Sequence, residues 1–196
     1  TPRRNIKGDE LACLLALNMT HPRILGEVKC SQNMYDEIDA HGGKSFMGKT
    51  GHSNIKKAMK ELGIDLAAEV SGHIYFKERY FGFDDGVYAM MRVLELVAKG
   101  YDLDAELDKL PRVFSTDEIK FNTSEEAKFK IIEALKAQIH AGIAELPPIR
   151  DIIEIDGIRV RFDDGWALVR ASNTTPVIVT RFEARSPEFR DEMQRV

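Results

Sequence analysis

The chain has 196 residues, of which 43% are hydrophobic and 31% are charged, and its formal net charge at pH 7 is −4. This is the balance of an ordinary globular protein, with a length that suits one large domain or two small ones. A negative net charge argues against a general attraction to nucleic acid or to an anionic membrane surface, and no apolar run is long enough to cross a bilayer.

Helices and strands alternate in the first half of the chain. Apolar residues at helical spacing and capping residues predict helices at residues 8–17, 31–41, 53–62 and 86–99. Short apolar runs predict strands at residues 23–29, 45–47 and 65–76, the last of them broken near Gly72. Ser53 is the expected cap of the third helix, and Asp84 or Asp85 that of the fourth. The alternation predicts parallel strands in a three-layer α/β/α domain, which we place at residues 1–112.

The apolar pattern changes after Leu110-Pro111. Residues 113–121 are mixed and polar and are predicted to be an interdomain linker, followed by a second domain at 122–196. Ser124 is expected to cap a helix that runs to about residue 141. The expected inner face of this helix consists of Phe129, Ile132, Leu135 and Ile139. Strands are predicted at residues 152–155, 158–162, 166–170 and 177–183, before a final helix that starts at Pro187. This half predicts a small α+β domain with an antiparallel sheet and helices on one side.

A dense group of hydrogen-bond donors lies between the last two predicted strands, at Arg170-Ala171-Ser172-Asn173-Thr174-Thr175-Pro176. An arginine offers a planar pair of donors that matches phosphate. Serine, threonine and asparagine permit tight turns whose backbone N–H groups point inward. The group therefore indicates a phosphate-binding loop, with an ordinary polar loop as the open alternative.

A second polar group lies in the segment Ala68-Glu69-Val70-Ser71-Gly72-His73. On an extended strand, Glu69, Ser71 and His73 would share one face, because alternate side chains do. A carboxylate, a hydroxyl and an imidazole together can read sugar hydroxyls, and an imidazole can also move a proton near neutral pH. The alternative is the polar face of an edge strand.

The two groups together resemble the phosphohexomutase family, which comprises phosphomannomutases and phosphoglucomutases. That family has a G-E-x-S-G-H type sugar loop and an R-x-S-N-T-x-P phosphate loop. Here Ala68 replaces the leading glycine and Val70 is at the variable position. The segments Val28-Lys29-Cys30, Gly48 to Ser53 and Lys77 to Gly86 also resemble family motifs, in the correct order along the chain.

The resemblance implies a reaction that moves a phosphoryl group between the 1- and 6-positions of a hexose. A phosphoserine donates its phosphoryl group, and a hexose 1,6-bisphosphate turns over in the site as the intermediate. The resemblance assigns Arg170 with Ser172, Asn173, Thr174 and Thr175 to the phosphate that is not transferred. Glu69 and Ser71 would hold the 3- and 4-hydroxyls, with Lys29 beside them. Thr175 has an alternative role as a cap of its loop.

Proton transfer is expected from His73, as general acid or base, with His52 as a second candidate. Each of His52, His73 and Lys29 has the alternative of an ordinary structural or surface side chain. The aromatic residues around the sugar loop are expected to pack against it. These residues are Tyr75, Tyr80, Phe81 and Phe83.

Two family motifs do not occur in this sequence: the T-A-S-H-N-P type catalytic serine motif and the D-G-D-x-D-R magnesium loop. We therefore expect a fragment that corresponds to the third and fourth domains of the family, without a metal site and inactive by itself. Mg²⁺ and the N-terminal domains would complete the enzyme, with a phosphorylated hexose as ligand and neither nucleic acid nor membrane as partner.

Three other interpretations stay open at this point. The chain could be a stand-alone phosphosugar-binding module, a phosphoglucosamine mutase or a structural interaction domain. A glutamine at the position of Val70 would be expected in the second case, and the third leaves both polar groups unexplained. Cys13 and Cys30 have no metal-ligand spacing and predict buried reduced thiols in a cytoplasmic protein. The preference between mannose and glucose does not follow from these motifs, because the two sugars differ at carbon 2.

Overall fold

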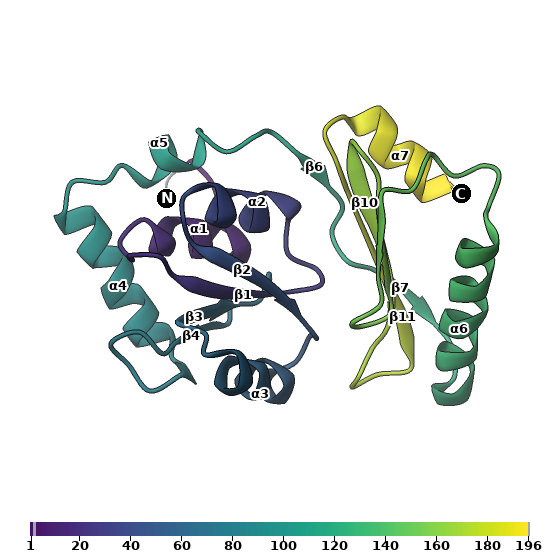
Figure 1. Ribbon diagram of the computed structural model, residues 1–196, viewed down its shortest axis with the longest axis horizontal. Helices are drawn as coiled ribbons and strands as arrows, with labels where there is room; N and C mark the ends of the chain where they lie inside the picture. Colours follow the sequence, from purple (N-terminus) through teal and green to yellow (C-terminus); the bar gives the residue numbers. More distant parts are fainter. Residues whose placement is uncertain (2, 196) are drawn as a thin grey trace. The chain divides into compact units, whose positions relative to one another are not determined.

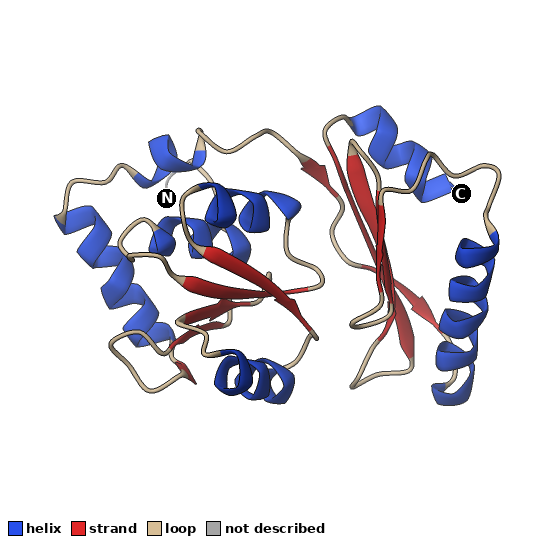
Figure 2. Ribbon diagram, in the orientation of Figure 1, coloured by secondary structure: helices blue, strands red, loops and turns tan. Residues whose placement is uncertain are grey.

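Two compact units make up the protein, Thr1–Pro111 and Arg112–Val196, and each has its own sheet (Figure 1). The computed structural model describes residue 1 and residues 3–195. The first unit is an α/β domain with a mixed sheet, and the second is an α+β domain with an antiparallel sheet (Figure 2). Both architectures confirm the fold class predicted from the sequence.

The first unit is built on a mixed sheet with the strand order β2-β1-β3-β4-β5. Its helices are α1 (Gly8–Ala16), α2 (Gln32–Ala40), α3 (His52–Leu62), α4 (Gly86–Ala98) and α5 (Leu103–Leu107). Its strands are β1 (Arg23–Glu27), β2 (Lys44–Gly48), β3 (Leu66–Ala68), β4 (Ile74–Phe76) and β5 (Phe83–Asp84). Strands β2, β1 and β3 pair in parallel, as predicted.

The pairing of β3 with β4 is antiparallel and corrects the expectation of a parallel sheet throughout. The segment 65–76 forms two strands, and residues 69–73 connect them directly. A parallel pair needs a crossover of a dozen or more residues, so this short connection can only close a hairpin. The registered pairs include Ala68 with Ile74 on either side of the connection.

The two faces of this sheet bury different side chains. Ile24 and Phe76 pack in the core formed with α1, α2 and α4, whereas Leu25 and Tyr75 pack with Ile55 of α3. Alternate residues of a strand point to opposite faces, which explains why neighbours in sequence belong to different cores. Figure 1 shows α1 and α2 on one face of the sheet and α3 on the other, which confirms the three-layer arrangement.

Two helix starts in this unit refine the predictions. Helix α3 begins at His52 and its N-cap is Gly51, with φ 113°, so Ser53 is not the cap. A left-handed φ of this size suits glycine, which has no Cβ. Helix α4 has the predicted cap, because the Asp85 carboxylate accepts a hydrogen bond from the backbone N–H of Tyr88 at 2.9 Å. Helix α5 and strand β5 were not predicted.

The apolar stripe that predicted α4 does not face the core. Val87, Met90, Met91, Leu94 and Val97 are all exposed. The buried positions of the helix are Ala89, Arg92 and Leu96. Tyr88 and Val93 also pack partly against the core. The helix is therefore apolar on both sides.

The second unit is an antiparallel sheet with the strand order β6-β11-β10-β9-β8, and β7 also pairs with β11. Its strands are β6 (Phe114–Ser115), β7 (Ile119–Asn122), β8 (Asp151–Ile153), β9 (Ile158–Arg161), β10 (Gly165–Ala171) and β11 (Val177–Ala184). Its helices are α6 (Glu125–Ala141) and α7 (Pro187–Arg195). Ile139 of α6 and Met193 of α7 share one core with Val160 and Phe182 of the sheet, so both helices cover the same face, as predicted.

Two predictions for this unit need correction. Residues 113–121, expected to be a linker, contain β6 and most of β7, because their backbone pairs with β11. Helix α6 is capped by Ser124, as predicted, but Phe129 is exposed and Lys128 takes the inner position above Ile132 and Ile139. An apolar pattern favours Phe129, whereas the structure buries the lysine because it has hydrogen-bond partners there.

Candidate functional site

Three polar loops of the first unit follow β1, β2 and β3 and lie at one edge of the sheet. These loops are residues 28–31, 49–51 and 69–73. Because the three strands are parallel neighbours, their carboxyl ends meet at the same edge. In open α/β sheets, ligands bind outside the carboxyl ends of the strands. This edge is therefore the candidate sugar-binding site of the first unit.

Glu27, the last residue of β1, ties the three loops together. Its carboxylate accepts hydrogen bonds from the Lys29 backbone N–H at 2.8 Å, the Thr50 hydroxyl at 2.9 Å and the Val70 backbone N–H at 3.3 Å. The side chain is fully buried. Burial raises the pKa of Glu27, against the opposing effect of the Lys29 ammonium and the three donors. One buried group thus sets the relative positions of three loops that are distant in sequence.

Lys29 is buried, whereas its alternative interpretation was a lysine at the protein surface. Its Nζ lies 3.9 Å from Glu27 Oε1. A second buried carboxylate, that of Asp9 in α1, accepts a hydrogen bond from the Ser31 backbone N–H at 2.8 Å. The loop that carries Lys29 is therefore held at both ends by carboxylates.

Glu69, Ser71 and His73 lie in a turn. The prediction that they share one face of an extended strand is therefore wrong. The Glu69 backbone N–H donates to the His73 carbonyl at 3.0 Å, and the Gly72 N–H donates to the Glu69 carbonyl at 2.9 Å. Glu69 is buried, whereas Ser71 and His73 are exposed. The alternating polar residues Glu69, Ser71 and His73 therefore belong to the turn of a hairpin rather than to an extended strand.

Tyr75 orients the Glu69 carboxylate from the adjacent strand. Its hydroxyl donates to Glu69 Oε1 at 2.9 Å. Burial and this hydrogen bond raise the pKa of Tyr75. A carboxylate accepts several hydrogen bonds, so Glu69 held in this way keeps the capacity to accept from sugar hydroxyls. Tyr75 is a site residue that the sequence analysis assigned only to packing.

The two candidate histidines meet at Asp84 of β5. His73 Nδ1 lies 2.7 Å from Asp84 Oδ2, and His52 Nε2 lies 3.5 Å from the same oxygen. The two imidazole rings are 6.3 Å apart in an edge-to-face arrangement. An ionised carboxylate only accepts, so Nδ1 of His73 donates to it and Nε2 is the acceptor in the neutral ring. Asp84 therefore holds the His73 ring through Nδ1.

The start of α1 contacts the same turn. The Gly8 backbone N–H donates to the Val70 carbonyl at 3.3 Å. A Cβ at residue 8 would collide with the carbonyl oxygen of Glu69, so the close approach requires glycine. Helix α1 thus supports the turn from behind.

In the second unit, Arg170 lies near the end of β10 and is almost fully buried. Its guanidinium forms two hydrogen bonds with Asp156, from Nε at 3.1 Å and from a terminal nitrogen at 3.4 Å. Asp156 lies in the turn between β8 and β9, where Gly157 has φ 80° and a Cβ would collide with the backbone of β10. The arginine is therefore fixed in place by an adjacent hairpin, and part of its guanidinium is paired with Asp156.

The loop that follows Arg170 is organised around Ser172. The Ser172 hydroxyl accepts from the backbone N–H groups of Thr174 and Thr175, both at 3.3 Å, and lies 2.9 Å from the Thr175 hydroxyl. The residues from Asn173 to Pro176 are exposed. These hydrogen bonds close the loop into a compact turn around the Ser172 side chain.

Lys128 of α6 supports this loop from the core. Its ammonium donates to the carbonyl oxygens of Ser172 at 2.8 Å and Thr175 at 3.2 Å, and it pairs with Glu125 at 2.7 Å. The lysine is only 1% exposed. Lys128 therefore fixes the carbonyl groups of the loop, while the Ser172 hydroxyl holds the N–H groups of Thr174 and Thr175.

The sequence analysis missed four candidate site residues, and the sequence pattern around two of them could have indicated their role. Glu27 is a charged residue directly after the apolar run of β1, and Lys128 recurs with the buried positions of α6 at helical spacing. The remaining two are Asp84, which was assigned only to helix capping, and Tyr75, which was assigned to packing.

Two searches of the described residues bear on cofactors and membranes. Residue 1 and residues 3–195 contain no group of three or more His, Cys, Asp or Glu side chains that could hold a metal ion. The described residues therefore do not provide a ligand set for Mg²⁺. In the same residues, no helix has both the length and the apolar character needed to cross a membrane.

Comparison with protein families matches both units. Residues 7–114 match the model described as phosphoglucomutase/phosphomannomutase, alpha/beta/alpha domain III. Residues 118–194 match the C-terminal domain of phosphoglucomutase/phosphomannomutase.

Individual relatives agree with the family models. The chain is 46% identical over 174 residues to a phosphomannomutase/phosphoglucomutase of Pseudomonas aeruginosa, which covers 88% of this chain and 36% of the relative. It is also 46% identical over 163 residues to a phosphoglucomutase of Neisseria gonorrhoeae, which covers 83% of this chain and 34% of the relative. The chain therefore spans little more than a third of the length of these relatives.

Among solved structures, a phosphoglucomutase/phosphomannomutase family protein from Burkholderia thailandensis superimposes with a TM-score of 0.85 at 38% identity. The match covers 97% of this chain and 40% of that protein. An N-acetylglucosamine-phosphate mutase superimposes with a TM-score of 0.64 at 13% identity, which shows a common fold alone.

Proposed function

Since the chain belongs to the phosphoglucomutase/phosphomannomutase family, we propose that it supplies the sugar-binding and distal phosphate-binding parts of an enzyme that interconverts hexose 1-phosphate and hexose 6-phosphate. The complete protein would carry the phosphoserine and the Mg²⁺ site in its remaining domains. The reaction would pass through a hexose 1,6-bisphosphate in the cytoplasm. A phosphorylated hexose is the expected ligand, and neither nucleic acid nor a membrane is an expected partner.

The observation that carries the proposal is the set of loops joined by Glu27 at the carboxyl edge of the first sheet. This edge presents Glu69 and Ser71 from the turn, and Lys29 from the loop after β1. A carboxylate accepts from ring hydroxyls, and a serine hydroxyl both donates and accepts. We assign Glu69 and Ser71 to the 3- and 4-hydroxyls and Lys29 to charge compensation for a phosphate.

The second unit would bind the phosphate that is not being transferred. Arg170, held by Asp156, would contribute the guanidinium N–H groups that Asp156 does not accept, and Ser172, Asn173, Thr174 and Thr175 form the loop beside it. Phosphate oxygens are equivalent, so such a loop binds a phosphate from either end of the sugar. This indifference is what the reaction needs, because the bisphosphate intermediate must bind in two opposite orientations.

Proton transfer is assigned to His73, with His52 as its neighbour. Asp84 holds Nδ1 of His73, which leaves Nε2 as the atom that takes or returns the proton of the attacking or leaving hydroxyl. Such positioned proton transfer contributes typically ~10²–10⁴-fold to a rate. His52 contacts the same carboxylate and would set the charge around it.

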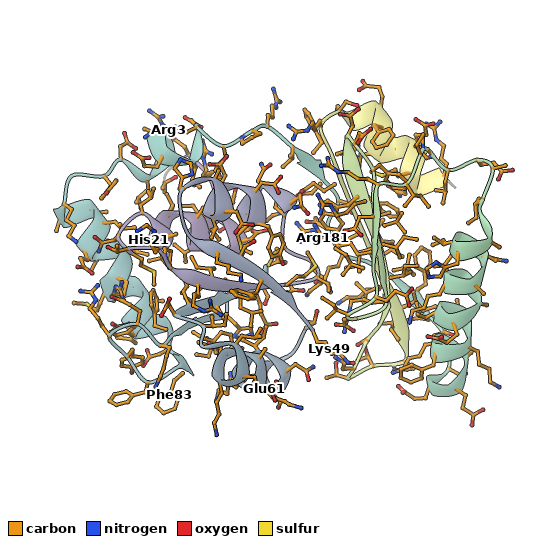
Figure 3. All side chains as sticks on the ribbon, in the orientation of Figure 1. Arg3, His21, Lys49, Glu61, Phe83 and Arg181 are labelled. Atoms are coloured by element: carbon orange, nitrogen blue, oxygen red, sulfur yellow. The ribbon has the colours of Figure 1, made fainter. Side chains whose placement is uncertain are left out.

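The test uses the full-length protein and an assay for conversion of glucose 1-phosphate to glucose 6-phosphate, repeated with mannose phosphates. We expect activity in the parent and a loss of about 10²-fold or more in His73→Ala. Glu61→Gln, a change at an exposed position of α3 labelled in Figure 3, is the matched control and should keep full activity. A full-length protein without activity on any hexose phosphate would overturn the proposal.

A further inference from the structure

Helix α4 has an apolar surface that nothing in the first unit covers within the described residues. Its sequence, Gly-Val-Tyr-Ala-Met-Met-Arg-Val-Leu-Glu-Leu-Val-Ala, carries charge only at Arg92 and Glu95. Leu96 is fully buried against the sheet, whereas Val87 on the outer side is 71% exposed. A helix that is hydrophobic all round is typical of the interior of a larger protein.

The outer apolar surface continues into the segment before the helix. Phe81 and Phe83 are exposed, and their rings stack at 6.0 Å. Figure 3 shows Phe83 at the outside of the first unit. We call these two residues, together with Val87, Met90, Met91, Leu94 and Val97, the α4 face. The α4 face contains seven of the thirteen large hydrophobic residues that are exposed in the described part of the chain.

This concentration distinguishes the α4 face from ordinary surface leucines and phenylalanines. Single exposed hydrophobic residues are normal, but a contiguous apolar patch marks an interaction site. The sequence analysis expected Phe81 and Phe83 to pack around the sugar loop, and the first unit by itself does not provide that packing.

The charges beside the α4 face are already paired with one another. Glu95 accepts from Arg79, at 2.7 and 3.2 Å, and lies 3.2 Å from Arg92 Nε. Arg92 also pairs with Glu78 at 2.7 Å. The hydrogen bond from Arg79 lowers the pKa of Glu95 to about 2, so the carboxylate stays ionised. Lys99 also pairs with Glu95 at 3.4 Å, and the Lys56 ammonium lies 5.8 Å from the centroid of the Phe83 ring. These charges border the α4 face, whereas the face itself consists of apolar side chains and complements an apolar partner.

The relatives indicate what covers this face. The chain spans 36–40% of the Pseudomonas relatives, and the family models that it matches are domain III and the C-terminal domain. The rest of those relatives therefore includes the domains numbered before domain III. We propose that the α4 face is the docking surface for the domain that precedes domain III in the full-length protein. This inference rests on family membership and does not depend on the proposed activity.

Methionine oxidation by hydrogen peroxide tests the proposal directly, because oxidation follows exposure. In the 196-residue chain, Met90 and Met91 are half exposed and Met34 is buried, so the first two should oxidise about tenfold faster than the third. In the full-length protein, we expect all three to oxidise at the slow rate of Met34. Equal fast oxidation of Met90 and Met91 in both proteins would overturn the proposal.

A charged variant provides a second readout. In full-length protein, Met90→Glu combined with Leu94→Glu should lower the melting temperature and restore fast oxidation of Met91. Lys57→Glu, on the exposed side of α3, is the matched control and should leave Met91 protected. In the 196-residue chain, the double variant should leave the melting temperature unchanged, because both side chains are at the surface.

Other occupants would give different results. Protection of Met90 in the 196-residue chain that rises with protein concentration, together with a dimer in sedimentation, would assign the face to a second copy and overturn the proposal. A gene that encodes no domain ahead of residue 1 would also overturn it. Loss of mutase activity with Met90 and Met91 still protected would count against the proposed function only.

Discussion

The loops that we propose to bind the sugar, in the first unit, and the loop that we propose to bind the phosphate, in the second, are supported by buried charges of opposite sign. Glu27 accepts hydrogen bonds from backbone N–H groups and a hydroxyl, whereas Lys128 donates to backbone carbonyls. Both side chains are fully enclosed. The sign of the supporting charge decides which backbone groups it binds, N–H groups in the first unit and carbonyl groups in the second.

This difference matches what each loop is proposed to bind. The buried ammonium of Lys128 binds the carbonyl oxygens of Ser172 and Thr175, so these acceptors are engaged within the protein and do not oppose a bound anion. A buried carboxylate draws N–H groups inward and stays beside Lys29, so the first unit presents a mixed surface of acceptors and donors. A sugar hydroxyl needs both kinds of partner, and a phosphate needs donors only.

Replacing Arg170 should give the largest effect, because it removes the fixed cation of the phosphate loop. Arg170→Ala should weaken hexose phosphate binding to the full-length protein by about 2–5 kcal/mol. Arg170→Lys keeps the charge but loses the two-pronged geometry, and we expect an intermediate loss. Isothermal titration measures both, and an Arg170→Ala loss no greater than that of Ser71→Ala would contradict the assignment.

Lys128→Met tests whether the buried ammonium shapes the phosphate loop. The change leaves the Ser172 carbonyl without its donor, at a cost of about 1–3 kcal/mol in phosphate binding or in stability. Urea unfolding and titration with inorganic phosphate separate the two effects. Glu125→Gln is the control, because Glu125 contacts Lys128 from an exposed position. Unchanged phosphate affinity and unchanged stability in Lys128→Met would remove the contrast drawn above.

Glu27→Gln tests the opposite support. Both carboxyl oxygens of Glu27 accept hydrogen bonds, whereas a glutamine has one oxygen and an NH2 group that cannot accept, so we expect a loss of about 1–2 kcal/mol in the free energy of unfolding. Burial raises the pKa of Glu27 above the ordinary value of 4.5, so the folded state binds this proton more tightly than the unfolded state. The stability from this linkage is therefore present below pH 4.5 and is lost as pH rises through the raised pKa.

Glutamine does not titrate, so the stability gap between the parent and Glu27→Gln should narrow from about pH 5 to about pH 8. Urea unfolding at the two pH values measures this gap, and other titrations cancel in the difference. A gap that widens as pH rises would contradict the raised pKa.

Ser71→Ala should give the smallest effect, because a single exposed hydroxyl is worth about 0.5–1.5 kcal/mol. We expect weaker binding of hexose phosphate and no change in the binding of inorganic phosphate, which has no ring hydroxyls. The same titrations as for Arg170→Ala measure this. Equal losses for the two ligands would place Ser71 near a phosphate rather than near the sugar ring.

The order of the elements could be predicted from the sequence because apolar periodicity and capping residues mark them locally. Asp85 and Ser124 cap the predicted helices. The pairing of strands that are distant in sequence has no comparable local sequence pattern. The antiparallel hairpin of β3 and β4, and the pairing of β6 and β7 with β11, depend on where the whole chain places those backbones.

The candidate site residues were predicted from motifs, but their supports were not. Glu27 is buried because three loops converge on it, and Lys128 is buried because the loop after β10 packs against α6. Both contacts are properties of the tertiary structure. The exposure of Val87 and Met90 was also hidden from the sequence, because periodicity identifies an apolar side without telling what covers it.

The turn between β3 and β4 is fixed at both ends by the pairing of Ala68 with Ile74. Adding or removing one residue between them would shift the register, which would turn Ile74 and Phe76 out of one core and Tyr75 out of the other. The length of this turn is therefore tied to the packing of the whole sheet. Substitutions can alter what the turn recognises, whereas insertions and deletions would unfold the unit that carries it.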